Sequence, residues 1–262
     1  MPLTLVTWNL KGSNRHDIAA VAAHLRAVGA DVVVLQEVQR RQANELARRL
    51  GAYSLTWGFK HWPVTVRPEG MAILGLAIPI EVDTRALSFR WRLWSSRRRI
   101  YQVARFLPSG SDAERWMLFN LHLSTAREAE RRAHEVATVL RTMGTTEDPA
   151  IVGGDLNDRP GAPLFAQFGA AGLRDAWAEV HPDADETEGA TNWPGWRPGT
   201  TKDPSRRLDY VLVNHALDVV AVDIPRPGEP GFDGFRTLSD HLPLTVTLAS
   251  RAPRPACQTR RP

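Results

Sequence analysis

Polar side chains stand at the ends of several apolar, strand-like runs in this sequence. Asn9 ends one such run in TWNL, and Glu37 ends another in VVVLQEV. A carboxylate beside an apolar strand costs free energy unless something pairs with it, and several converging carboxylates need a cation between them. The other members of this set occur in FNLHL, GGDLND, LDYVLV and SDHLP, and they are Asn120, His122, Asp155, Asn157, Asp209, Asp240 and His241.

The residue types in this set suit a divalent metal ion and phosphoryl transfer. Side-chain oxygens of Asn, Asp and Glu are the ligands that hard cations such as Mg²⁺ or Mn²⁺ prefer. The two histidines suit the binding of a phosphoryl oxygen or the movement of a proton near neutral pH. Together these groups would support metal-dependent hydrolysis of a phosphodiester by in-line attack of an activated water.

Each of these residues, taken alone, also has a simpler explanation. Asn9 at a strand end could be a turn former, and Glu37 could begin the next helix, where a negative charge is favoured. Asp209 could form an ion pair with Arg206 or Arg207. The presence of all of them in one chain is what favours a site.

Short apolar strands and amphipathic helices must position these side chains. Alternation predicts a strand over residues 3–8, and apolar residues at three- and four-residue spacing predict a helix from Ile18 to near Gly29. A wholly apolar strand over residues 31–36, buried on both faces, and a helix over residues 40–50 follow. Further strands are expected at 53–57, 71–77, 100–106, 116–121, 150–152, 208–213, 219–224 and 244–248, with a hairpin turn over 107–115 and a helix over 126–143.

The elements mix βαβ pieces with antiparallel hairpins, and two packed sheets flanked by helices would bury them. No linker rich in Pro, Gly or Ser divides the chain, so a single domain over residues 1–250 is predicted. The loop over residues 183–199 is expected to be docked by Trp193 and Trp196. Residues 251–262 are predicted to form a disordered basic tail.

The charge of the chain does not identify its partner. There are 33 Lys and Arg residues against 29 Asp and Glu, and the pI is about 9.7. Four of the arginines lie in the tail, which leaves the two counts equal elsewhere. The single cysteine, Cys257, also lies in the tail, so it forms neither an intramolecular disulfide nor a cysteine-based metal site. With no recognisable leader and no run long enough to span a membrane, a cytoplasmic protein is expected.

The order of the motifs TWNL, LQE, NLHL, GGDLND, RLDYVLV and SDHLP resembles that of the endonuclease/exonuclease/phosphatase superfamily. The resemblance extends from Leu3 to Leu248. It implies a DNase I-like α/β (α+β) fold, which is a four-layer α/β/β/α sandwich of two mainly antiparallel sheets. It also implies a site at one end of the two sheets.

The resemblance suggests roles for the individual residues. Glu37 looks like the principal metal ligand, with Asn9 and Asp240 adjoining it. Asp155 and Asn157 resemble the pair that orients or activates the attacking water.

The histidines have counterparts in the same superfamily. Asp209 would fix the ring of His241, and His241 would contact the phosphate or accept a proton. His122 resembles the second histidine of the deoxyribonuclease and sphingomyelinase branches, which stabilises or protonates the leaving oxygen. The substrate-binding residues expected in addition are Asn120, Arg207, Tyr210 and Trp193, the last by stacking.

Two features bear on the branch of the superfamily. Lys11 stands where abasic-site endonucleases carry an Asp, and NLHL replaces their Tyr-containing segment, so abasic-site repair is disfavoured. The segment SFRWRLWSSRRRIYQVAR suits phosphate contact with base stacking. It would suit a phospholipid surface almost as well, and an amphipathic strand pair with a solvated turn explains it equally. Its arginines are Arg90, Arg92, Arg97, Arg98 and Arg99, interleaved with Trp91 and Trp94.

The sequence therefore predicts a Mg²⁺- or Mn²⁺-dependent phosphodiesterase, with a nuclease acting on nucleic acid as the first hypothesis. A lipid or small-molecule phosphoesterase, similar to sphingomyelinases or inositol-phosphate phosphatases, is the alternative, and a lipid surface is then the partner. A third hypothesis is an inactive member that only binds a partner. A monomer is expected.

Overall fold

A computed structural model describes residues 2–13, 17–61, 68–92, 95–108, 115–185 and 187–251, with the side chains of 61, 89–97 and 126 excepted. The predictions for the basic tail, for Trp94 and for most of the 107–115 turn lie outside these residues. So do those for the side chains of Arg90, Trp91, Arg92 and Arg97.

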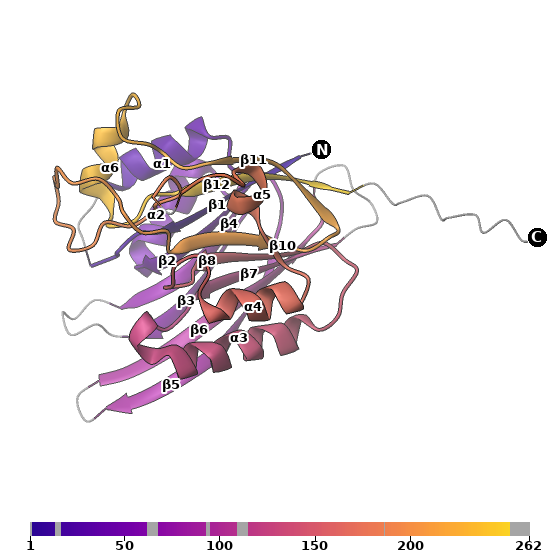
Figure 1. The fold of residues 1–262 in the computed structure, drawn as a ribbon. Coiled ribbons are helices and arrows are strands. Elements are labelled where there is room, and N and C mark those ends of the chain that lie inside the picture. The colour runs from indigo at the N-terminus through magenta and orange to yellow at the C-terminus, as the bar shows by residue number, and fades with distance from the viewer. Residues whose placement is uncertain are drawn as a thin grey trace, which may run out of the picture.

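The described strands form two six-stranded sheets (Figure 1). The order in the first sheet is β11 (Leu217–Asp223), β12 (Leu244–Ser250), β1 (Leu3–Asn9), β2 (Val32–Val38), β4 (Glu69–Gly75) and β3 (Ser54–His61). The order in the second is β5 (Glu81–Arg92), β6 (Ser95–Phe106), β7 (Trp116–His122), β8 (Ala150–Asp155), β10 (Asp209–Val213) and β9 (Arg174–Asp175). Apart from the parallel pairs β1–β2 and β7–β8, neighbouring strands are antiparallel.

A helical crossover joins each parallel pair, because parallel neighbours cannot be connected by a tight turn. Helix α1 (Ile18–Ala27) joins β1 to β2, and its N-terminus is capped by the Asp17 carboxylate, which accepts from the backbone of Ala19 and Ala20. Helix α3 (Ala129–Met143), preceded by the short helix η1 (Ala126–Glu128), joins β7 to β8. The two crossovers bring the carboxyl ends of β1 and β2, and of β7 and β8, to common edges.

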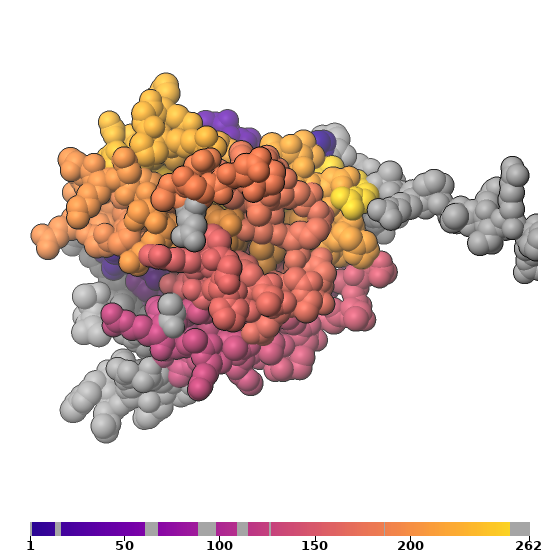
Figure 2. Space-filling model, viewed as in Figure 1, coloured from indigo at the N-terminus to yellow at the C-terminus, as the bar shows by residue number. Residues whose placement is uncertain are grey.

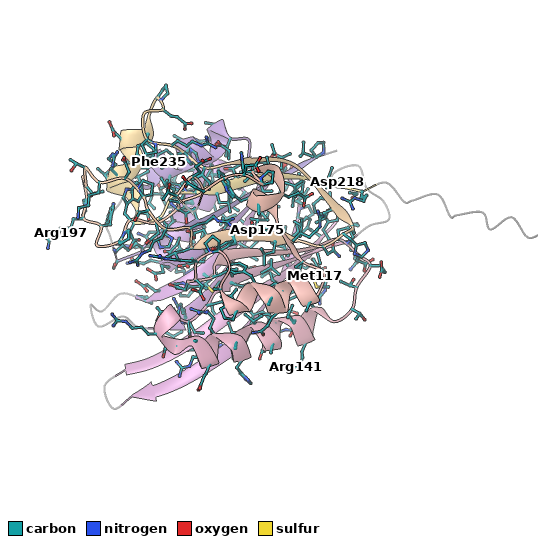
Figure 3. All side chains as sticks on the ribbon, in the orientation of Figure 1. Met117, Arg141, Asp175, Arg197, Asp218 and Phe235 are labelled. Carbon is teal, nitrogen blue, oxygen red and sulfur yellow. The ribbon has the colours of Figure 1, made fainter. Side chains whose placement is uncertain are left out.

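Helices cover the outer face of each sheet. In Figure 1, α1, α2 (Arg40–Leu50) and α6 (Phe232–Leu238) lie over the first sheet, and α3 and α4 (Pro163–Ala170) over the second. Figure 2 shows α3 and α4 on the surface, below the segment that precedes β10. Phe235 of α6, labelled in Figure 3, packs its ring against His24 of α1 and Trp8 of β1.

Three apolar clusters separate the four layers. One lies between the sheets and includes Val34 and Ile151. The second joins α3 and α4 to the second sheet, and the third joins α1 and α2 to the first sheet through residues such as Val33. Val33 and Val34 are fully buried on opposite faces of β2, as its apolar sequence predicts. The predicted four-layer α/β/β/α sandwich is confirmed.

Several elements are absent from the sequence prediction. Strand β5 is an edge strand that pairs only with β6, and most of its described side chains are exposed, so it carries no apolar alternation. Helices α4, α6 and α5 (Ala176–Val180) have 8, 7 and 5 residues, too few to establish a helical period. The docking of the 183–199 loop by its tryptophans is confirmed, since Trp193 and Trp196 are buried in the same cluster as Val34 and Ile151, although residues 187–188 and 197–199 are exposed. Among the described helices, none is long and apolar enough to cross a membrane.

Candidate active site

The ends of five strands bring the predicted residues of the two sheets together. Asn9 is the last residue of β1 and Glu37 lies near the end of β2. His122 and Asp155 end the parallel strands β7 and β8 and are register partners. Asp209 begins β10, which runs antiparallel to β8, so it also lies opposite Asp155. The site therefore forms at one end of the two sheets.

The SDHLP segment joins this group because β12 runs antiparallel to β1. Ser239 Oγ donates to the Asn9 carbonyl at 2.6 Å and accepts from the His241 amide at 3.2 Å. The indole of Trp8 donates to the His241 carbonyl at 2.9 Å. These bonds fasten the segment to β1 and hold the His241 ring at the strand ends.

A cavity of about 480 Å³ opens between the strand ends. Asp209 does not line it and lies behind His241. Seven of the predicted chemical residues do line it, and they are Asn9, Glu37, His122, Asp155, Asn157, Asp240 and His241.

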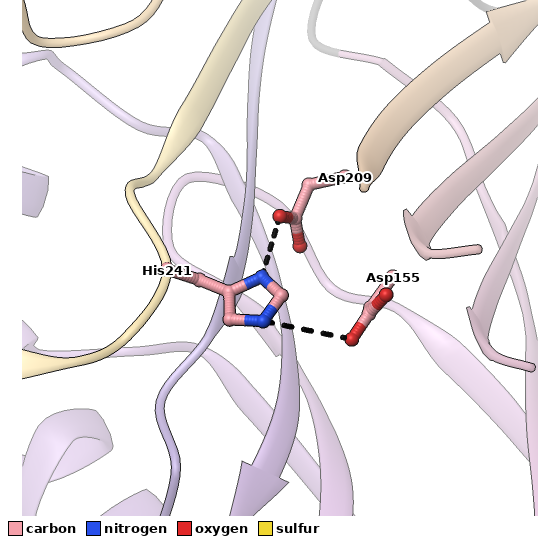
Figure 4. A group of neighbouring side chains, drawn as sticks. All are labelled: Asp155, Asp209 and His241. Carbon is pink, nitrogen blue, oxygen red and sulfur yellow. Dashed lines mark hydrogen bonds and ion pairs between the residues drawn. The ribbon is translucent and has the colours of Figure 1, made fainter. Parts of the chain in front are cut away.

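Asp209 and His241 form a buried carboxylate–imidazole pair (Figure 4). His241 Nδ1 lies 2.7 Å from Asp209 Oδ2, and the Thr191 hydroxyl donates to the same oxygen at 2.6 Å. Burial lowers the pKa of His241, but Asp209, Asp155 and Asp240 outweigh it and raise the pKa to about 10. The ring is therefore cationic at neutral pH, with Nε2–H directed toward Asp155 Oδ2 at 3.9 Å.

The simpler explanation of Asp209, an ion pair with Arg206 or Arg207, does not hold in the structure. Arg207 instead donates to Asp175 Oδ2 at 2.7 Å. Asp209 has His241 as its ionic partner.

Asp155 is held in place by two donors. Its Oδ2 accepts from the Asn9 amide side chain and its Oδ1 from the Asn157 backbone amide, both at 2.9 Å. Burial raises the pKa of Asp155 to about 6, and the carboxylates of Asp209 and Glu37 add to this rise, while His241 and Asn9 oppose it. A cation beside this carboxylate would favour its ionised form.

Glu37 has an unusual backbone conformation. Its φ is +51°, in the left-handed region, at an irregularity in the pairing of β2 with β4. Its carbonyl accepts from Gly12 N at 2.5 Å, and a Cβ at residue 12 would come within 2.2 Å of that oxygen. The carboxylate is 27% exposed and lies 3.7 Å from His122 Nε2. Glu37 does not begin the next helix, because Gln39 is the N-cap of α2.

Asp240 already has a cationic neighbour. Lys11 Nζ lies 2.7 Å from Asp240 Oδ2 and 5.0 Å from the centre of the Trp196 ring. Lys11 is the residue that distinguishes the first motif from that of abasic-site endonucleases. Lys11 itself does not line the cavity, but it pairs with Asp240, which does.

Several cavity residues were absent from the predicted site, and two of them, Lys60 and Arg99, are basic groups beside His122. Lys60 is 1% exposed, and its Nζ lies 3.0 Å from His122 Nδ1. Burial, with the nearby charge of Arg99, lowers the pKa of Lys60 to about 7. The Arg99 guanidinium contacts the His122 carbonyl at 3.5 Å. Both side chains line the wall of the cavity beside His122.

Of Lys60 and Arg99, only Arg99 belongs to a pattern recognisable in the sequence, the arginine-rich segment. Lys60 belongs to a strand whose alternate residues Leu55 and Trp57 pack against the first sheet's outer cluster. The opposite face would be solvent-exposed in a single sheet. Here it faces the second sheet, as shown by Gly58, where a Cβ would contact Thr84 and Ile100.

Asn120 does not line the cavity. It is fully buried, and its amide nitrogen donates to the Leu35 and Ala72 carbonyls and to Gln102. Its oxygen accepts from Gln36 at 2.8 Å. Asn120 therefore links the two sheets and is not placed to contact substrate.

The other three predicted substrate contacts are also occupied within the fold. Arg207 is bonded to Asp175, and the Tyr210 hydroxyl donates to the carbonyls of Asp158 and Arg207. Neither Arg207 nor Tyr210 lines the cavity. Trp193 does line it, but its side chain is 2% exposed and its indole donates to the Lys202 carbonyl, so no ring face is open for stacking.

A protein-family model covers most of this chain. The family model described as "Endonuclease/Exonuclease/phosphatase family" matches residues 6–241. No curated protein sequence gives a significant match.

Solved structures share the fold. An endonuclease/exonuclease/phosphatase from Beutenbergia cavernae is 23% identical with a TM-score of 0.73, over 95% of this chain and 72% of that one. The human Nocturnin catalytic domain with bound sulfate is 22% identical with a TM-score of 0.70, over 95% and 94%. D. rerio TDP2 complexed with a single-strand DNA product is 19% identical with a TM-score of 0.71, over 95% and 99%.

The TM-scores of these three structures establish a shared fold. The family model, in contrast, covers nearly the whole chain, from the first strand to His241. The chain therefore belongs to the endonuclease/exonuclease/phosphatase family.

Proposed function

We propose that this protein is a divalent-metal-dependent phosphodiesterase and that it acts on nucleic acid. The observation that carries the proposal is the convergence of Asp155, the Asp209–His241 pair, Glu37 and His122 on one cavity. Carboxylate, amide and imidazole groups at such distances provide the charge stabilisation and proton transfer that phosphodiester hydrolysis requires.

The oxygen atoms around Glu37 fit a hard cation. Glu37 carries a partly exposed carboxylate, Asp155 a buried one with a raised pKa, and Asn9 an amide beside it. We propose that Glu37, with Asn9 and Asp240 adjoining, holds Mg²⁺ or Mn²⁺. When bound, such an ion neutralises the charge that develops on the phosphoryl oxygens.

Asp155, Asp209 and His241 form another compact group, with ligand atoms within 4.8 Å of one another. We do not assign a metal there. His241 Nδ1 is already bonded to Asp209, and its raised pKa keeps the ring protonated, whereas a metal ligand must be the neutral imidazole.

The polar residues of the cavity would then have separate catalytic roles. Asp155 and Asn157 orient the attacking water, and the raised pKa of Asp155 suits it to accept a proton near neutral pH. The His241 imidazolium donates from Nε2 to a phosphoryl oxygen. His122 stands nearby, with Lys60 Nζ 3.0 Å from its Nδ1, and its Nε2–H would donate a hydrogen bond that stabilises the leaving oxygen.

The choice of nucleic acid rests on charge and on a relative. Lys60 and Arg99 line the cavity, which favours an anionic substrate. D. rerio TDP2, which shares the fold, has been solved with a single-strand DNA product.

A substrate panel tests the proposal. Single-stranded DNA, duplex DNA, RNA, sphingomyelin and inositol phosphates would be offered with Mg²⁺, with Mn²⁺ and with EDTA. We expect metal-dependent cleavage of a nucleic acid, abolished by EDTA and retained by Asp183→Asn, a change at an exposed carboxylate outside the cavity. Cleavage of lipid or inositol phosphate alone would replace nucleic acid as the substrate. Failure on every substrate would contradict the catalytic assignment.

A further inference from the structure

A second cavity of about 460 Å³ adjoins the catalytic one. The two share the wall formed by Thr125, Asn157, Arg206 and Leu208. Asn157 is the residue that follows Asp155 by two positions and bonds to it. A molecule with its scissile group beside Asp155 could therefore extend into the second cavity without crossing the protein.

Three guanidinium groups from separate segments line this second cavity. Arg127 belongs to η1, Arg159 follows β8, and Arg206 precedes β10. All three side chains are exposed, and none has a hydrogen-bond or ion-pair partner among the described residues. We call this cavity, with Arg127, Arg159 and Arg206, the arginine pocket.

The neighbouring arginines behave differently. Arg131 pairs with Glu128 at 3.1 Å, and Arg132 is bonded to Asp158. Asp158 is the carboxylate that lines the arginine pocket, and it also accepts from the Arg159 backbone amide at 3.0 Å. The charge of Asp158 is thus neutralised by Arg132, which leaves three arginine side chains, unpaired among the described residues, lining the arginine pocket.

The backbone of the arginine pocket is fixed even though the side chains are exposed. The Arg206 carbonyl accepts from the amides of Thr191 and Asn192 at 2.8 and 2.9 Å. The Arg159 carbonyl accepts from Ala162 N at 3.2 Å. Three like charges held on separate segments repel one another unless an anion lies between them.

We propose that the arginine pocket binds a substrate phosphate adjacent to the one that is cleaved. The inference rests on the proposed phosphodiesterase function and specifies its substrate as a nucleic-acid strand with consecutive phosphates. Guanidinium groups match phosphate oxygens with paired N–H donors. A single phosphodiester with a cationic head group, such as sphingomyelin, would instead place its positive charge against three arginines.

The test compares substrates with and without a flanking phosphate. The double variant Arg127→Gln/Arg159→Gln changes residues that do not line the catalytic cavity. The substrates are a single-stranded DNA oligonucleotide and bis(p-nitrophenyl) phosphate, which has one phosphodiester and no neighbour. We expect the ratio of kcat/KM for the oligonucleotide to that for the small diester to fall at least about tenfold, mainly through the oligonucleotide KM.

A charge-matched control separates the pocket from general electrostatics. Arg48→Gln/Arg141→Gln removes two positive charges at the C-terminal ends of α2 and α3, and the ratio should change less than about twofold (Arg141 is labelled in Figure 3). An unchanged ratio in Arg127→Gln/Arg159→Gln would overturn the proposal. So would an equal loss on both substrates, or an equal loss in the control.

A binding measurement keeps the proposal testable if the protein cleaves neither substrate. Fluorescence anisotropy with the same oligonucleotide in EDTA, over a salt series, reads binding without turnover. The double variant should bind more weakly. The slope of its log binding constant against log salt concentration should become shallower by about 0.7 for each phosphate contact removed. One outcome is that the wild type cleaves neither substrate while the double variant still shows weaker binding and a smaller salt slope. In that case the arginine pocket is supported and the catalytic proposal fails. Equal affinity and slope for variant and wild type would overturn the pocket.

Discussion

Asp155 is a buried carboxyl group with other carboxylates nearby, and the fold keeps it there at a cost in stability. Burial raises its pKa from an ordinary value of 3.8 to about 6. The folded state therefore binds the proton more tightly than the unfolded chain does. Stability falls as the pH rises from about 4 to about 6 and stays lower above that range.

Asp155→Asn should consequently stabilise the metal-free protein. In EDTA at pH 8 we expect a gain of about 1–3 kcal/mol in the free energy of unfolding, because the amide carries no charge to desolvate. At pH 4, where the carboxyl is protonated in the folded state, the gain should largely vanish. Urea denaturation at the two pH values measures both. The same difference at both pH values would contradict the assigned origin of the effect.

His241 has the opposite pH dependence. Its pKa is raised from 6.5 to about 10, so the Asp209–His241 ion pair contributes fully below about pH 6.5. That contribution is lost as the pH rises toward 10. The free energy of unfolding of the metal-free wild type should therefore fall more steeply between pH 7 and pH 10 than that of His241→Asn. Parallel pH profiles of the two proteins would show that the ion pair is not formed in solution.

At the level of elements, the sequence predicts the helices and strands whose apolar residues recur with a clear period. The helix over residues 40–50 matches α2, and the apolar strands match β1 and β2 within two residues at each end. Edge strand β5 and the short helices α4, α5 and α6 were missed because they bury too few residues in a regular pattern. The left-handed conformation of Glu37 has no sequence signal of its own, since it depends on the close approach of Gly12.

The contact between Gly12 and Glu37 makes a testable prediction. Gly12→Ala would place its Cβ 2.2 Å from the Glu37 carbonyl, so the backbone that aims the Glu37 carboxylate must shift. We expect a loss of about 1–3 kcal/mol in stability and a larger proportional loss of metal-dependent activity. Gly169→Ala, in α4 with open space around it, is the control and should be neutral or stabilising. Normal activity and stability in Gly12→Ala would mean that this contact does not position Glu37.

At the scale of the whole molecule, the candidate site exists only where the two sheets meet. Asn9 of the first sheet donates to Asp155 of the second across 146 positions of sequence, and Asn120 links the sheets beneath them. The periodicity of the sequence predicts that each residue lies at a strand end, but it does not predict how the two sheets pack against each other. The family resemblance supplied that arrangement. The resemblance did not identify Lys60 as a cavity residue, nor did it predict that Asn120, Tyr210 and Trp193 are buried. These features depend on how this chain's own side chains pack.

The central claim is that Asp155 and His241 carry out metal-dependent phosphodiester hydrolysis in the cavity between the sheets. The most direct measurement is the turnover rate of a DNA oligonucleotide with Mg²⁺ for wild type, Asp155→Ala and His241→Ala, each checked for folding by circular dichroism. We predict that each variant stays folded and loses roughly 10²–10⁴-fold in kcat, the usual scale for removing a catalytic group. Near-normal turnover by either folded variant would contradict the account.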